Sequence, residues 1–157
     1  MICLGVDPAT TRIAVADETG RCAYVDVPRG EDGARRMAKI HSATQKIVHE
    51  FIGDDCPEVC FVESPAGHVH PSLWQAFGVI GAAVWVTLST VELFPVSVLA
   101  IGPTEWKRVL LDNGAASKAQ IMEWARAEGY EGRVQDEADA LGIARAGLRL
   151  LKSRPTA

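Results

Sequence analysis

Short apolar runs separated by polar turns open the chain. The run at the N-terminus ends at Asp7 and is followed by Pro8. Proline cannot donate a hydrogen bond to a β-ladder, so we expect a buried strand that ends at Asp7. Two further strands are expected over 12–17 and 21–27, joined by a short turn. Strands joined by such short connections must run antiparallel.

Apolar positions at helical spacing appear from residue 32 onward. They predict helices over 32–51, 73–88, 103–112 before the Asn113-Gly114 break, 118–127 after an N-cap at Ser117, and 135–151. Two short apolar runs between them predict strands over 59–62 and 94–99. The first of these leads into Glu63-Ser64-Pro65, which repeats the order of strand, acid and proline seen at Asp7. The element order predicts an α/β domain.

Composition is that of an ordinary globular protein. The chain has 157 residues, of which 48% are hydrophobic and 23% charged, which fits a single domain over 1–151 followed by a frayed tail over 152–157. The uncharged window 69–91 is long enough to raise the question of a membrane span. Polar residues shorten its apolar centre, so we expect a buried helix and no membrane partner. No signal peptide is expected at the N-terminus.

The cysteines and the net charge narrow the chemistry further. None of the four cysteines forms a Cys-x-x-Cys pair, and Cys3 and Cys60 lie in apolar runs, so we expect reduced thiols and a cytoplasmic protein. A zinc site on Cys56 and Cys60 would lack the usual second pair of ligands. The net charge of −4 argues against a nucleic-acid partner. That objection weakens if several acids are neutralised by bound metal ions.

Two acids begin the last predicted helix. Asp136 and Asp139 are three residues apart and share one helix face, whereas Glu137 points elsewhere. Acids in a first turn also complement the helix dipole, which is the alternative explanation. The residues that follow include several alanines and glycines, which allow this helix to lie close to the sheet.

These acids are expected to meet the two at the strand ends. With Asp7 and Glu63 on neighbouring strands, the helix would complete a cluster of four carboxylates: Asp7, Glu63, Asp136 and Asp139. Unpaired charges so close together are costly. Oxygen ligands suit Mg²⁺ or Mn²⁺, and the expected chemistry is two-metal hydrolysis of a phosphodiester.

The motifs around these acids resemble a known family. Gly-Val-Asp-Pro at Asp7, Phe-Val-Glu at Glu63, Asn-Gly-Ala-Ala-Ser-Lys-Ala-Gln from Asn113 and Asp-Glu-Ala-Asp-Ala-Leu-Gly-Ile-Ala from Asp136 occur in this order. Over nearly its whole length the chain resembles the RuvC-type Holliday-junction resolvases of the ribonuclease H-like superfamily. The resemblance implies a five-stranded mixed sheet, three antiparallel strands then two parallel, with helices on both faces.

The same resemblance implies an activity and its residues. It implies a homodimer, formed through the 73–88 helix, that cuts four-way DNA junctions at symmetry-related positions and leaves a 5′-phosphate and a 3′-hydroxyl. The four carboxylates would be the ligands of two Mg²⁺ or Mn²⁺ ions, with Asp7 bridging both. Lys107 and Lys118 match lysines that face DNA in the family, although solvent-exposed lysines beside a turn are the alternative. The sequence does not indicate a helicase partner.

Two departures and three alternatives accompany the resemblance. Ala9 replaces a glycine of the family, and Ala66 stands where cellular enzymes place a phenylalanine that inserts at the junction. His68 and His70 follow. Contact with phosphate and assistance in proton transfer are two roles they could have, and a position in an exposed loop is the third alternative.

Three alternative functions remain. One is an actin-like ATPase, which would need a second domain. The others are a broader nuclease that cuts forks, flaps or RNA:DNA hybrids, and a non-catalytic junction-binding protein.

Overall fold

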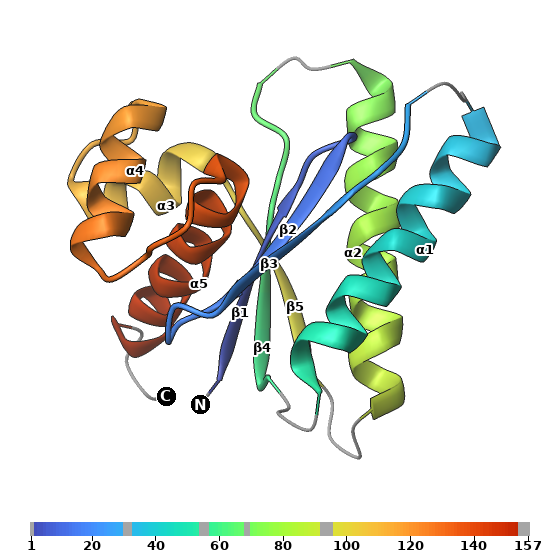
Figure 1. The fold of residues 1–157 in the computed structure, drawn as a ribbon, viewed down its shortest axis with the longest axis horizontal. Helices are drawn as coiled ribbons and strands as arrows, with labels where there is room; N and C mark the ends of the chain where they lie inside the picture. The colour runs from blue at the N-terminus through green and yellow to red at the C-terminus, as the bar shows by residue number, and fades with distance from the viewer. Residues whose placement is uncertain (1, 30–32, 54–56, 68–69, 92–95, 154–157) are drawn as a thin grey trace.

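A five-stranded mixed sheet forms the centre of the protein. The computed structural model describes residues 2–29, 33–53, 57–67, 70–91 and 96–153. The sheet order is β3-β2-β1-β4-β5 (Figure 1). The strands are β1 (Cys3–Pro8), β2 (Arg12–Asp17), β3 (Cys22–Asp26), β4 (Val59–Glu63) and β5 (Ser97–Ile101). The first three pair antiparallel, while β4 is parallel to β1 and β5 is parallel to β4. The predicted fold class is confirmed.

Helices cover both faces of this sheet. They are α1 (Gly33–Ile52), α2 (Pro71–Val91), α3 (Pro103–Leu111), α4 (Lys118–Ala127) and α5 (Gln135–Ser153). Figure 1 shows α1 and α2 on one side of the strands and α3, α4 and α5 on the other. Each side has its own apolar core, because side chains of a strand alternate between the two faces. The carboxyl ends of β1, β4 and β5 therefore meet at one edge, between the two groups of helices.

Glycines allow α5 to lie directly on the sheet. A Cβ atom at Gly5 of β1 would lie 2.2 Å from the carbonyl oxygen of Ala140, and one at Gly147 would lie 2.2 Å from the ring of Phe61. Side chains larger than hydrogen are thus excluded at both contacts. The predicted close approach of the last helix is confirmed, and it brings the start of α5 to the end of β1.

Some predicted boundaries differ from the structure. β1 continues through Pro8, which pairs with Ile13. The pairing of β1 with β4 ends earlier, at Val6 and Val62. The N–H that Pro8 lacks is therefore not needed for a hydrogen bond to β4. β5 runs over 97–101 rather than 94–99; residues 94 and 95 lie outside the described part, and pairing with β4 carries the strand on to Ile101. The last helix includes 152 and 153, which the prediction gave to the tail.

The apolar helix α2 is buried along one face only. Ile80, Val84 and Leu88 are buried against the core it shares with α1, whereas Trp74 is 48% and Trp85 55% exposed. The prediction of a buried helix is therefore right for one face and wrong for the other. Within the described residues α2 is also the one helix long and apolar enough to cross a membrane. Core helices of soluble proteins meet the same criterion of length and composition. Its packing against α1 accounts for the apolar side that faces inward.

The cysteines in the described residues are free thiols. Cys3 and Cys60 are buried, and Cys22 is partly exposed. Burial raises the pKa of the Cys3 and Cys22 thiols to about 12, so both are protonated and poorly nucleophilic near neutral pH. Cys56, the other candidate zinc ligand, lies outside the described residues. These thiols behave as small apolar side chains of the two cores.

Candidate metal centre

Three of the four predicted carboxylates meet at the carboxyl edge of the sheet. Asp7 lies near the end of β1, and Asp136 and Asp139 lie in the first turns of α5. One ligand oxygen from each of the three lies within 4.8 Å of the other two. The strand places one acid and the helix the other two, and the glycine contact between β1 and α5 holds them together. The sequence-based expectation that these residues converge is confirmed.

The electrostatics of this group show how crowded it is. Burial raises the pKa of Asp7 well above its usual value, and the negative charges of Glu63, Asp139 and Asp136 raise it further. Burial also raises the pKa of Asp139, which a hydrogen bond from Gln135 and the charge of Lys107 partly offset. Like charges this close disfavour full ionisation. Protonation or a bound cation would relieve the repulsion among these carboxylates.

Glu63 lies at the same edge, at the end of β4, but stands slightly apart. It does not belong to the three-carboxylate group. Its Oε1 accepts a 2.6 Å hydrogen bond from the indole Nε1 of Trp106. Burial raises the pKa of Glu63, the Trp106 hydrogen bond lowers it, and the charge of Asp139 raises it. Glu63 is therefore close enough to interact with the other acids and is oriented by a neighbour.

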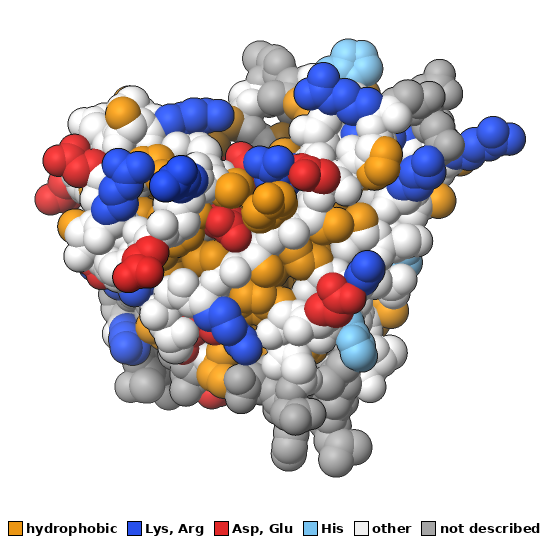
Figure 2. Space-filling model, viewed as in Figure 1, with side chains coloured by type: hydrophobic (Ala, Val, Ile, Leu, Met, Phe, Trp, Pro, Cys, Tyr) orange, Lys and Arg blue, Asp and Glu red, His pale blue; other side chains and the backbone are white. Residues whose placement is uncertain are grey.

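Cations surround the carboxylates. Both predicted lysines act on them: Lys118 lowers the pKa of Asp7, and Lys107 lowers that of Glu63. The Arg12 guanidinium, which sequence reasoning missed, lies 3.7 Å from Asp136, donates to Asp26 at 2.7 Å and stacks on Tyr24. Figure 2 shows lysine and arginine side chains across the upper part of this face, with carboxylates among them. A negative net charge thus coexists with a local basic surface.

Three residues that contact the acids were not anticipated: Arg12, Trp106 and Gln135. Gln135 donates to Asp139 at 3.0 Å. Arg12 and Trp106 are far from their acids in the sequence, so no spacing could have predicted those two contacts. Gln135 is different, because residues four apart on a helix are neighbours and its contact with Asp139 could have been predicted. Glu137 points elsewhere, as predicted, and accepts a hydrogen bond from Tyr130 at 2.6 Å.

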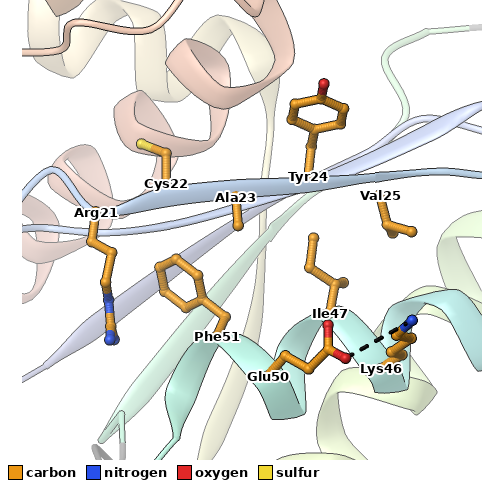
Figure 3. Close-up of a pocket in the computed structure, with 9 residues that line it drawn as sticks. All are labelled: Arg21, Cys22, Ala23, Tyr24, Val25, Lys46, Ile47, Glu50 and Phe51. Atoms are coloured by element: carbon orange, nitrogen blue, oxygen red, sulfur yellow. Dashed lines mark ion pairs between the residues drawn. The ribbon is translucent and has the colours of Figure 1, made fainter.

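Other candidate positions lie away from this group. His70 is exposed, and its Nδ1 is 2.8 Å from the hydroxyl of Ser72 at the start of α2; His68 lies outside the described residues. Ala66 is exposed. A groove of about 510 Å³ opens between β3 and α1, and the side chains of Ala23 and Val25 point from β3 toward α1 (Figure 3). None of the predicted site residues lines this groove.

The donor set of the carboxylate group fits a hard divalent cation. It offers only carboxylate oxygens, and no cysteine or histidine of the described residues belongs to it. Such ligands suit Mg²⁺ or Mn²⁺ and disfavour the softer metals that thiolates select. A cation would also relieve the repulsion that raises the pKa of Asp7. The chemistry of the site therefore matches a divalent metal centre.

Two curated proteins are similar in sequence to this chain over most of its length. The chain is 32% identical over 152 residues to a RuvC crossover junction endodeoxyribonuclease of Anaeromyxobacter sp. (strain K), an alignment that covers 92% of this chain and 78% of the relative. It is 29% identical over 155 residues to the RuvC of Moorella thermoacetica, covering 92% and 89%. No protein-family model matches the sequence.

The fold is similar to that of a solved RuvC. The structure of T. thermophilus RuvC in complex with a Holliday junction substrate matches with a TM-score of 0.73 at 24% identity, covering 97% of this chain and 95% of that one. The identity to the Anaeromyxobacter relative extends over most of both sequences. The chain belongs to the RuvC family of crossover junction endodeoxyribonucleases.

Proposed function

We propose that this protein is an endonuclease that resolves four-way DNA junctions by paired, symmetric incisions. The observation that supports this best is the meeting of Asp7, Asp136 and Asp139 at the sheet edge of a RuvC-family chain. Its relatives carry the name crossover junction endodeoxyribonuclease, and the similar T. thermophilus structure contains a Holliday junction substrate. The basic surface around the acids is suited to a polyanionic substrate.

Asp7, Glu63, Asp136 and Asp139 would hold two divalent ions, Mg²⁺ or Mn²⁺. When bound, the ions supply Lewis-acid polarisation of the phosphodiester and a more acidic water. The carboxylates would supply the oxygen ligands, and the two strand ends and one helix start that carry them would set their spacing. The expected products are a 5′-phosphate and a 3′-hydroxyl.

Lys107 and Lys118 would bind DNA phosphates next to the scissile bond. Both lie close enough to the carboxylates to influence their protonation, as their effects on Asp139 show. Lys118 is exposed, and the Lys107 ammonium lies 5.4 Å from the Trp106 ring centroid. Two cations beside an acidic centre can offset the charge of the approaching phosphate, which four carboxylates alone would repel.

A homodimer through α2 would place two such sites on one junction. The outward face of α2 carries Trp74 and Trp85, which are 48% and 55% exposed. Between them, a Cβ atom at Gly78 or Gly81 would have no neighbour within 4 Å, so this face has room for a second helix. Exposed tryptophans beside small residues are typical of protein interfaces. A second copy would cover apolar surface that α1 leaves open.

A substrate panel tests the activity. A synthetic four-way junction, a fork, a flap, a linear duplex and an RNA:DNA hybrid are incubated with Mg²⁺ or Mn²⁺, each strand labelled separately. We expect symmetric cuts in the junction, little cleavage of the duplex, and none with Asp7→Asn. Equal cutting of all substrates would leave a nuclease but refute junction selectivity. Junction binding without cleavage in either metal would instead favour a non-catalytic binding protein.

Sedimentation tests the dimer. The chain should sediment as a dimer at micromolar concentration, and Trp85→Glu should produce a folded monomer, since a charge would replace an apolar side chain in the interface. Thr90→Glu introduces the same charge at an exposed position of α2 that lies on a different helix face from Trp85, and it serves as the control. A wild-type chain that sediments as a monomer at these concentrations would contradict paired incision by a dimer.

A further inference from the structure

Trp106 connects β4 and α5, two of the three elements that carry the carboxylates. It lies in α3, and its side chain is 0% exposed within the core that α3, α4 and α5 share with the sheet. Its ring is apolar, but its Nε1–H needs an acceptor once it is removed from water. That acceptor is Oε1 of Glu63, at 2.6 Å. A short hydrogen bond to an ionised group is stronger than one between neutral partners.

The opposite edge of the ring is fitted to α5. A Cβ atom at Gly142 would lie 2.6 Å from Cζ3 of Trp106 and 3.1 Å from Cε3, so only glycine leaves room for the ring. Gly142 is three residues after Asp139, on the next turn of the same helix. One edge of Trp106 therefore contacts Gly142, near Asp136 and Asp139 on α5, and its N–H reaches the carboxylate of Glu63 on β4.

This arrangement does more than fill the core. A buried indole could satisfy its N–H with any backbone carbonyl, and a leucine or phenylalanine would fill apolar space without needing an acceptor. Here the donor fixes Oε1 of Glu63, and the carboxylate is close enough to Asp139 for the two charges to interact. Among the described residues, Trp106 is the hydrogen-bond donor that the structure gives this carboxylate. Without it, rotation of the glutamate side chain would move the oxygens away from the other acids.

We propose that Trp106 is a positioning residue of the metal centre: its indole N–H orients the Glu63 carboxylate, and its ring sets the spacing between β4 and α5. This inference rests on the proposed function, in which Glu63 is a metal ligand. Partners of metal ligands typically contribute 10- to 100-fold to metal affinity or activity. We therefore expect Trp106→Phe, which removes the N–H, to weaken Mg²⁺ binding about tenfold or more.

The first test observes the hydrogen bond directly. In the full chain labelled with ¹⁵N-tryptophan, the four indole N–H groups give separate NMR cross-peaks. Substitution of each of the other three tryptophans by phenylalanine identifies the cross-peak of Trp106 by elimination. Mg²⁺ should shift this cross-peak with the midpoint of metal binding and leave that of Trp124 unchanged. Glu63→Gln should move the Trp106 cross-peak without any metal, because the acceptor loses its charge. An unmoved Trp106 cross-peak at saturating Mg²⁺ would overturn the proposal, even if Trp106→Phe fails to fold.

The second test separates positioning from core packing. Trp124→Phe removes an equal ring from α4, where Trp124 is partly buried and stacks with Arg145. Both variants should lose stability, but only Trp106→Phe should weaken Mg²⁺ binding in calorimetry and regain cleavage at high Mg²⁺ concentration. Equal Mg²⁺ affinity in both variants would overturn the role of Trp106 and leave the proposed nuclease intact. Unchanged Mg²⁺ binding in Asp7→Asn would instead refute the metal centre itself.

Discussion

Gly5 lies two residues before Asp7, where α5 crosses β1. A Cβ atom at this position would lie 2.2 Å from the carbonyl oxygen of Ala140 and 2.4 Å from the amide nitrogen of Ala144. Both are backbone atoms, so no rotamer change relieves the overlap. In Gly5→Ala, α5 must therefore move away from β1 by about 1 Å to restore an ordinary contact.

This displacement has two measurable consequences. Overpacking of a well-packed core costs about 3 kcal/mol of the free energy of unfolding when the neighbours cannot adjust. The same movement separates Asp136 and Asp139 from Asp7, and a misplacement of about 1 Å in a catalytic arrangement costs about 100-fold in rate. We therefore expect Gly5→Ala to be less stable and to cleave junctions about 100-fold more slowly, with weaker Mg²⁺ binding.

Urea unfolding, Mg²⁺ calorimetry and single-turnover cleavage measure these quantities. Gly147→Ala is the matched control. Gly147 lies on the same helix, α5, and a Cβ atom there would lie 2.2 Å from the ring of Phe61 in β4. It is eight residues beyond Asp139, about 12 Å along the helix axis. It should lose stability but retain metal affinity and rate. Wild-type Mg²⁺ affinity and cleavage in Gly5→Ala would refute the reasoning, as would an equal loss of metal binding in Gly147→Ala.

Three further predictions follow from the site and its surroundings. Without metal, the pKa of Asp7 is higher in the folded state than in the unfolded chain, so the folded state binds a proton more tightly at this residue. The free energy of unfolding therefore falls as pH rises from about 4 through the raised pKa. Asp7→Asn in EDTA should therefore be more stable than wild type at neutral pH and have a flatter dependence on pH; a steeper one in urea unfolding would contradict this. Lys118→Ala should weaken junction binding and reduce the slope of log affinity against log salt by about 1, whereas Lys118→Arg should keep the slope. Ser117→Ala removes a capping box with Gln120 at the start of α4 and should cost about 1 kcal/mol in thermal unfolding, with Ser117→Asp retaining most of the stability.

The sequence predicted those features that depend on neighbours along the chain. Strand, acid and proline recur at Asp7 and Glu63, and the spacing of Asp136 and Asp139 places them on one helix face. Short connections predicted the antiparallel pairing of the first three strands, whereas the parallel pairing of the later two followed from the family resemblance. Apart from the resemblance, each of these is a local or topological constraint, so the α/β fold and the meeting of the acids could be expected before the structure was known.

Only the tertiary structure decided which side chains surround the acids. The hydrogen bond from Trp106 to Glu63 joins residues 43 positions apart, and Arg12 of β2 lies 3.7 Å from Asp136 of α5. The exclusion of a side chain at Gly5 depends on the backbone of Ala140, which no periodicity reveals. Such contacts arise when two cores pack against one sheet, because packing selects partners by shape and distance in space and not by spacing along the chain.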